Sequence, residues 1–146
     1  MIRPAELQLV DVAAELVSAA RTLSRHRLGA VIVWDPSTSL DGGVILDARV
    51  SRQLLVATFS PESLNDLRVG ATVIRGGRVE RAAVPITWTD VIERADELAA
   101  GAALEVDEDT GQIRHVDRMG RVEIVDATSL THVLHRRALA AGRPAR

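Results

Sequence analysis

The sequence contains no cysteine and no lysine, and it has only three aromatic residues. The absence of cysteine excludes thiol catalysis, disulfide bonds and cysteine-ligated metal sites. The absence of lysine excludes a lysine Schiff base and the lysine of a phosphate-binding P-loop. The three aromatic residues, Trp34, Phe59 and Trp88, are too few to indicate a stacking platform for single-stranded nucleic acid.

Long apolar runs are also missing, since none approaches the ~20 residues that a membrane-spanning helix needs. The amino-terminal stretch has no positively charged segment followed by an apolar one, the pattern of a secretory signal. We therefore predict no membrane association and a cytoplasmic location. With 18 basic and 20 acidic residues and a net charge of −2, the chain also lacks the broad positive surface that duplex DNA requires.

The composition that remains is that of one folded domain. The 146 residues are 47% hydrophobic and 26% charged, which is typical of globular proteins. No linker long enough to divide the chain is visible, so we predict a single domain over residues 1–146 that ends in a tail at 142–146.

Hydrophobic periodicity predicts an α/β fold. Apolar residues at helical spacing indicate a first helix over 5–25, and the β-branched run 30–34 indicates a buried strand. Ser51 is a candidate N-cap for a helix through Phe59, and residues 35–43 have the chemistry of a loop.

The second half of the chain continues this alternation. Gly76-Gly77 predicts a tight hairpin between strands at 69–75 and 78–86. Thr87 or Thr89 is expected to cap a helix over 90–100. A strand at 102–106, a hairpin formed by 112–116 and 122–125, and a helix at 129–141 complete a mixed sheet flanked by helices.

Four segments in order along residues 23–125 together resemble the diadenylate cyclase (DAC) domain. They are Arg27-Leu28-Gly29-Ala30-Val31-Ile32-Val33, the stretch from Leu46 to Leu55 with Phe59-Ser60-Pro61, the stretch from Gly70 to Val79, and Val106-Asp107-Glu108-Asp109-Thr110-Gly111. In that family two domains meet face to face, each holding one ATP, and condense them into cyclic di-AMP with a divalent metal. The resemblance therefore implies a purine nucleotide as ligand, Mg²⁺ or Mn²⁺ if the domain is active, and a homo-oligomer or an active homologue as partner.

The resemblance also implies site residues. Gly70, Ala71, Thr72 and Thr110 match nucleotide-binding segments, and Glu108 aligns with an acidic residue near the metal and nucleotide. Joining a 3′-hydroxyl to an α-phosphate needs metal ions and cations on the phosphates. Glu108 is therefore a candidate catalytic and metal-binding residue, and an ordinary solvated turn at 107–109 is the alternative.

The sequence departs from the family at two places. Val69 precedes Gly70 where the family has the aspartate of its Asp-Gly-Ala motif, which binds the metal. Asp66 is a candidate replacement as catalytic and metal-binding residue, and an ordinary turn at 65–66 is the alternative. The family's Arg-His-Arg motif is missing after the hairpin, where Arg94 is the candidate phosphate-binding cation.

Two other sets of residues match simpler explanations. Arg25-His26-Arg27 spells the missing tripeptide, but it lies at the end of the first helix, where cations favour the helix dipole. His132 and His135 have a spacing that can share a metal, yet no third ligand stands beside them.

Three functions follow as hypotheses. The first is a nucleotide-binding domain of the diadenylate-cyclase type that is catalytically degenerate and binds ATP or cyclic di-AMP. The second is an active cyclic di-AMP synthase that uses Asp66, Glu108 and Arg94 in changed positions. The third is an oligomerisation module without enzymatic activity.

Overall fold

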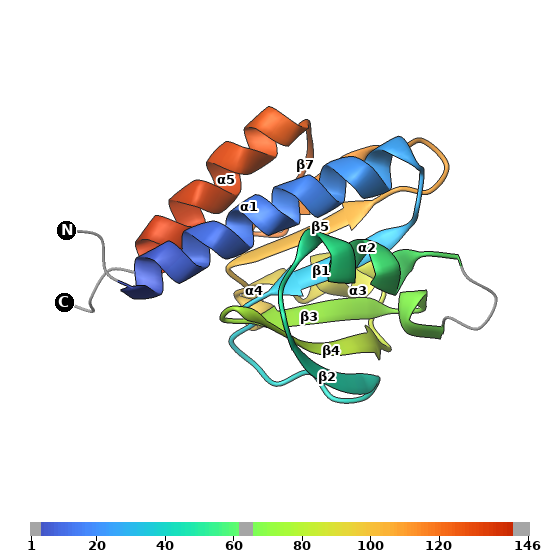
Figure 1. Cartoon of the computed structure of the whole chain (residues 1–146), viewed down its shortest axis with the longest axis horizontal. Coiled ribbons are helices and arrows are strands. Elements are labelled where there is room, and N and C mark those ends of the chain that lie inside the picture. The colour runs from blue at the N-terminus through green and yellow to red at the C-terminus, as the bar shows by residue number, and fades with distance from the viewer. Residues whose placement is uncertain (1–3, 62–65, 142–146) are drawn as a thin grey trace.

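A seven-stranded mixed sheet carries helices on both faces (Figure 1). The computed structural model describes residues 4–61 and 66–141, and the expected tail at 142–146 lies outside these ranges. The strand order is β2-β4-β3-β1-β5-β6-β7. Of the paired strands, β1 and β3 run parallel and all the others are antiparallel. The predicted α/β class with a mixed sheet is confirmed.

Apart from β2, η1 and the division of the third helix into α3 and α4, the elements follow the chain in the predicted order. They are α1 (Pro4–Arg25), β1 (Ala30–Trp34), β2 (Val44–Arg49), α2 (Arg52–Phe59), the 3-10 turn η1 (Asp66–Arg68), β3 (Ala71–Arg75), β4 (Arg78–Val84), α3 (Trp88–Glu93), α4 (Ala95–Leu98), β5 (Ala102–Val106), β6 (Ile113–Val116), β7 (Val122–Val125) and α5 (Ala127–Ala141).

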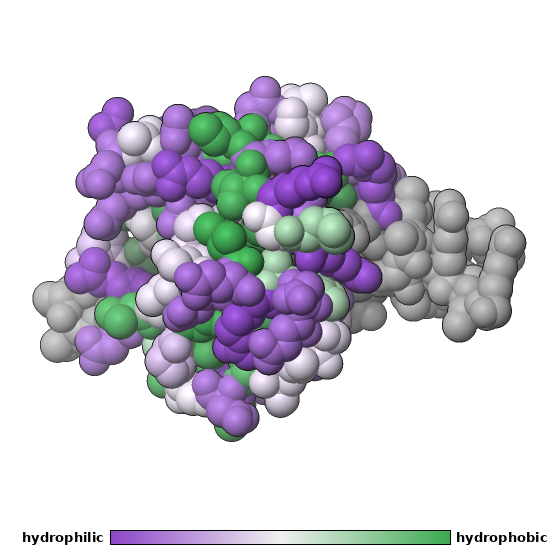
Figure 2. Space-filling view, turned by 180° about the vertical axis from the view of Figure 1, so that it is seen from behind, coloured by the Kyte–Doolittle hydropathy of each residue, from purple (hydrophilic) through white to green (hydrophobic). Residues whose placement is uncertain are grey.

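The sheet separates two hydrophobic cores. Helices α1, α2 and α5 cover one face (Figure 1), where Ile32 of β1 packs among their apolar side chains. Helices α3 and α4 cover part of the other face, where Val33 packs with Val91 and Leu98. Consecutive residues of β1 point to opposite faces of the sheet, and both faces are covered by a core. This explains why the sequence of the strand is apolar at every position instead of alternating. Figure 2 shows the α3 side, where apolar residues gather along the middle between hydrophilic ones.

Two helix starts have the predicted chemistry. The Ser51 side chain accepts a hydrogen bond from the backbone N–H of Leu54, as an N-cap does. Of the two candidates for the next helix, Thr87 is the cap, and it forms a reciprocal capping box with Asp90. The prediction of one continuous helix over 90–100 is wrong. Arg94, with φ −103° and ψ 18°, leaves the helical conformation and separates α3 from α4.

Strand β2 was not predicted, because its apolar residues do not alternate over a useful length. It is an edge strand that pairs only with β4, and its register shifts between Ile45 and Ala48. Asp47 adopts a left-handed φ of 45° within this irregularity. The bulge leaves Val44 and Ile45 exposed, so the strand has no clean buried face for a periodicity argument to detect.

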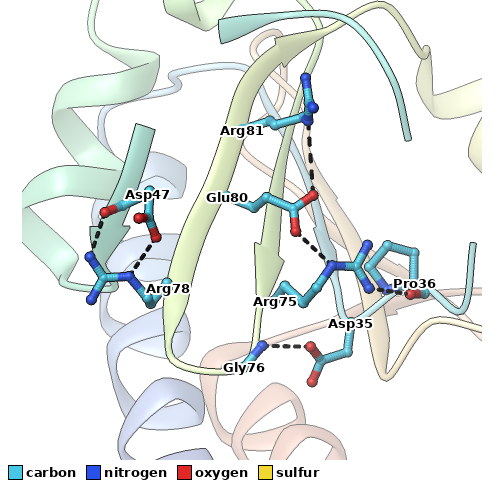
Figure 3. Close-up of polar contacts among 8 residues, drawn as sticks. All are labelled: Asp35, Pro36, Asp47, Arg75, Gly76, Arg78, Glu80 and Arg81. Atoms are coloured by element: carbon cyan, nitrogen blue, oxygen red, sulfur yellow. Dashed lines mark hydrogen bonds and ion pairs between the residues drawn. The ribbon is translucent and has the colours of Figure 1, made fainter. Parts of the chain in front are cut away.

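A polar cluster ties the carboxyl ends of β1 and β3 together (Figure 3). Asp35 Oδ1 accepts a hydrogen bond of 2.7 Å from the backbone N–H of Gly76. The Arg75 guanidinium bridges Glu80, at 2.7 Å, and the carbonyl of Pro36, at 2.9 Å. Burial raises the pKa of Asp35 against the opposing effects of the Gly76 hydrogen bond and the Arg75 charge. This cluster fixes one end of the sheet and leaves the amino ends of β1 and β3 for a site.

Candidate functional site

A cleft of about 600 Å³ lies at the amino ends of β1 and β3, on the side of the sheet that carries α3. This volume falls in the range of small-molecule sites. Its lining residues are Arg27, Leu28, Gly29, Ala30, Val31, Phe59, Pro61, Arg68, Gly70, Ile86, Thr87, Trp88, Glu105, Val106, Asp107, Glu108 and Asp109. Five separate segments of the chain therefore meet around it.

Glycines bring these segments close together at β3. Gly70, just before the strand, has φ +90°, and a Cβ there would lie 2.3 Å from the Val84 carbonyl oxygen. No side chain fits at that distance, so β3 and the end of β4 approach closely only because position 70 is glycine. Ala71 and Thr72 follow with fully buried side chains and do not line the cleft. Of these three predicted residues, Gly70 alone lies on its wall.

The acidic turn after β5 forms another wall. Asp107 Oδ1 accepts hydrogen bonds from the backbone N–H groups of Asp109, at 2.8 Å, and Thr110, at 3.3 Å. Asp107 Oδ2 lies 3.3 Å from an Arg114 nitrogen. Asp107 is thus engaged in holding the turn, while the neighbouring Glu108 is exposed at the cleft.

The side chain of Glu108 lies beside Gly29, the residue just before β1. A Cβ built on Gly29 would lie 3.3 Å from Glu108 Cβ and 3.5 Å from its Oε2. Among the described residues Glu108 has no ion pair or hydrogen bond through its carboxylate. This predicted residue therefore presents an ionisable group to the cleft, positioned by the glycine opposite it.

The turn is also fastened to the end of α1. The Ser24 hydroxyl donates to the Gly111 carbonyl at 2.5 Å, and Arg27 Nη1 donates to the Asp109 carbonyl at 3.2 Å. Gly111 has φ +76°, and a Cβ there would meet the Ser24 carbonyl oxygen at 2.8 Å. Close backbone packing at Gly111 thus fixes the acidic turn beside Arg27, which lines the cleft.

Glu105 lines the base of the cleft on β5. It pairs with Arg114 of β6 at 3.0 Å, and its side chain is 19% exposed. Burial raises the pKa of Glu105, and the Arg114 hydrogen bond and charge oppose that rise. Arg114 therefore forms ion pairs with both Glu105 and Asp107, two of the four acidic residues that line the cleft.

The remaining wall comes from the start of α3. Trp88 is half-buried, packs against the apolar core on this side and lines the cleft. The cavity of about 600 Å³ remains beside it, so the indole ring narrows the cleft without filling it. An aromatic side chain on the wall of a cleft can stack on a planar ring such as a nucleobase.

Three other predicted residues lie off the cleft wall. Asp66 is exposed on η1 and is absent from the lining, whereas Arg68 of the same turn lines it. Arg94 pairs with Glu97 at 3.1 Å, between α3 and α4. Thr110 Oγ1 accepts a hydrogen bond from the Gln112 N–H within the acidic turn.

Sequence reasoning assigns no site role to Arg27, Arg68 or Trp88, although all three line the cleft. The tripeptide Arg25-His26-Arg27 has the pattern of a solvated helix end, which conceals the role of its last residue. The sequence signal that could have identified Arg27 is its position just before the strand at 30–34. That strand begins at the cleft. Arg68 belongs to the three-residue stretch 67–69 before Gly70, and nothing in its local pattern marks it.

The donor groups do not fit a preformed metal centre. In residues 4–61 and 66–141, no three His, Asp or Glu side chains come together in a way that would hold a metal ion. Val69, where the resemblance expects an aspartate, is 66% exposed and carries no ligand atom. Over the same residues, no helix is both long and apolar enough to cross a membrane.

Comparison with known proteins agrees with this architecture. The chain is similar to a double cysteine mutant of DacA from Staphylococcus aureus, with a TM-score of 0.75 and 20% identity over 87% of this chain and 95% of that one. It is also similar to a hypothetical membrane-spanning protein from Bacillus cereus, with a TM-score of 0.68 and 24% identity over 77% of this chain and 62% of that one. At these identities the likeness shows the fold alone.

No curated protein matches the chain by sequence. A family match is found over residues 17–127, for the family described as DAC, DisA bacterial checkpoint controller nucleotide-binding. This stretch contains β1, β3, the acidic turn and every residue that lines the cleft. Because the match covers well over half of the sequence, the chain belongs to the DAC family of DisA-type nucleotide-binding domains.

Proposed function

We propose that this protein is a nucleotide-binding domain of the diadenylate-cyclase type that binds ATP or cyclic di-AMP without synthesising the cyclic product. The observation that carries the proposal is the open cleft of about 600 Å³. Its walls include segments through which the chain resembles the family, with Gly29, Gly70 and Glu108 among their residues. A purine ring beside Trp88 and phosphates near the arginines would use the chemistry these walls offer.

The proposal of lost catalysis rests on what stands around this cleft. Condensation of two nucleotides needs a group that activates the 3′-hydroxyl and screens phosphate charge. Val69 supplies neither, and Asp66 is exposed outside the lining. Arg94, the candidate replacement for the missing cationic motif, is engaged with Glu97 away from the cleft.

The alternative is an active cyclic di-AMP synthase, and Glu108 is the observation in its favour. Its exposed carboxylate faces the cleft beside Asp109, and Mg²⁺ is commonly held by one or two carboxylates together with substrate phosphates. The described side chains form no metal centre of their own, so a metal ion at Glu108 would need the nucleotide phosphates as further ligands.

Incubation of the protein with ATP and Mg²⁺ or Mn²⁺ separates the two functions. We expect a rise in thermal midpoint, since a ligand that binds only the folded state stabilises it, and no cyclic di-AMP by mass spectrometry. Product that disappears in Asp66→Asn or Glu108→Gln would establish the synthase instead. No thermal shift with ATP or cyclic di-AMP at millimolar concentration would reject nucleotide binding and favour a purely structural module.

A matched pair of glycine substitutions tests the location. At both Gly29 and Gly101, a Cβ would have its nearest non-neighbouring atom at 3.3 Å, but only Gly29 lines the cleft. Gly29→Leu should abolish the thermal shift by ATP, whereas Gly101→Leu should preserve it. Equal shifts in the two variants would place the nucleotide elsewhere.

A further inference from the structure

We propose that Arg27 and Arg68 together form the phosphate-binding subsite of the cleft, which rests on the nucleotide-binding function proposed above. Among the described residues, they are the two cationic side chains in its lining. A guanidinium presents a planar fork of donors that matches phosphate oxygens in a bidentate manner. Neither residue belongs to the segments in which a cationic motif was expected, so this assignment comes from the structure.

The strand pairing brings the two arginines to the same edge of the sheet. Arg27 precedes the first residue of β1 by three positions, and Arg68 precedes the first residue of β3 by three positions. These strands are parallel neighbours, with Ile32 level with Thr72, and neighbouring strands lie ~4.8 Å apart. Two segments that are 41 positions apart in the sequence therefore supply equivalent cations to one mouth of the cleft.

The backbone at Arg27 gives an independent indication. Helix α1 ends with hydrogen bonds from Leu28 N to Leu23 O, at 2.9 Å, and from Arg27 N to Ser24 O, at 3.1 Å. This is the helix ending in which the residue at position 27 takes a left-handed conformation and is usually glycine. Arg27 adopts φ 53°. An arginine held in a conformation that disfavours side chains points to a use for its guanidinium.

The acidic turn orients the Arg27 side chain. A Cβ on Gly111 would lie 3.7 Å from Arg27 Cγ, so the arginine stem rests against this glycine. Its Nη1 donates to the Asp109 carbonyl, and this single bond leaves most of the five N–H donors of the guanidinium available. Arg68 forms no ion pair or hydrogen bond with another described residue and is exposed at the lining.

Two of the four acidic residues of the cleft are paired with a cation other than these two arginines. Glu105 and Asp107 share Arg114 as an ion-pair partner, so part of the negative charge is balanced from outside the lining. The two positive charges of Arg27 and Arg68 balance those of a single phosphate or phosphodiester group, which carries at most about two negative charges at neutral pH. The subsite therefore suits AMP or cyclic di-AMP as ligands that need no metal.

Calorimetric titration with AMP and with adenosine tests the subsite in Arg27→Gly, Arg68→Ala and the control Arg25→Ala. Arg25 lies on the same helix end as Arg27, but in a different groove from the cleft. We expect each cleft variant to lose at least tenfold in AMP affinity, with adenosine affinity unchanged, and the control to bind both ligands as the parent does. Arg27→Gly should also keep or raise the thermal midpoint, because glycine relieves the left-handed backbone.

The outcomes are decisive in each direction. AMP affinity that stays within twofold of the Arg25→Ala control in both cleft variants would overturn the subsite and leave nucleotide binding intact. A fall in thermal midpoint together with equal losses for AMP and adenosine in Arg27→Gly would show a structural role and also overturn it. If the parent protein binds none of adenosine, AMP, ATP and cyclic di-AMP, the proposed function itself fails.

Discussion

Replacing Gly111 by alanine tests how the acidic turn is held against α1. Gly111 has φ +76°, and a Cβ would lie 2.8 Å from the Ser24 carbonyl oxygen, which belongs to the backbone. The left-handed conformation costs alanine about 1 kcal/mol, and overpacking against a fixed backbone adds about 1–3 kcal/mol. We therefore expect the free energy of unfolding of Gly111→Ala to fall by about 2–4 kcal/mol.

Gly76→Ala is the matched control for this substitution. Gly76 has a similar φ of +61°, but nothing lies within 4 Å of a Cβ built there. It should lose about 1 kcal/mol or less, because only the backbone conformation is penalised and alanine restricts the unfolded chain. Urea unfolding followed by circular dichroism measures both, with the slope against urea unchanged for a clean comparison. Equal losses in the two variants would refute the close packing of the turn against Ser24.

Three further predictions concern charge, metal and the aromatic wall. Burial raises the pKa of Asp35, so stability is lost as the pH rises through that raised pKa and the carboxyl ionises. Asp35→Asn keeps an acceptor for Gly76 and should be more stable than the parent at neutral pH, and this advantage should vanish as the pH falls toward 3.8. Urea unfolding across pH measures the difference in stability. A difference that stays constant with pH would contradict the raised pKa of Asp35. Removing Mg²⁺ with EDTA should weaken ATP binding at least tenfold and leave AMP binding nearly unchanged in calorimetry. The reason is that the four carboxylates of the cleft repel the more highly charged triphosphate when no metal screens it. Equal effects on the two ligands would argue against this electrostatic explanation. Trp88→Ala should weaken adenosine binding by about 1–3 kcal/mol, the range of base–aromatic stacking, while Trp88→Phe should retain most of it, and an unchanged adenosine affinity in Trp88→Ala would exclude stacking.

The fold was predictable wherever local chemistry decides the element. The Gly76-Gly77 hairpin and the Ser51 cap appear as expected, because turn and cap requirements depend on neighbouring residues alone. Strand β2 was not predictable in this way, since its pairing with β4 and its bulge at Asp47 arise from tertiary contacts. The helix break at Arg94 also lacks a local signal, because no proline or glycine marks it.

The residues that line the candidate cleft were predictable only in part, for a physical reason. Gly70 and Glu108, which line the cleft, were predictable because each stands in a segment that resembles the family. Arg27 and Arg68 reach the same cleft through the pairing of β1 with β3, and a sequence without known pairings does not reveal which loops share a sheet edge. Asp66 shows the converse, since its proximity to Gly70 in the sequence did not bring it into the lining.

The retained glycines also explain why family membership leaves catalysis open. A side chain at Gly70 would collide with the Val84 carbonyl, and one at Gly111 would collide with the Ser24 carbonyl. Both positions thus favour glycine for structural reasons, whether or not the cleft performs chemistry. Motifs that contain Gly70 and Gly111 therefore identify the fold. Function depends on the side chains that the fold places at the cleft. The positions that discriminate are those at which folding permits alternatives. They are Val69, where the resemblance leads one to expect a metal-binding aspartate, and the cations Arg27 and Arg68 before β1 and β3.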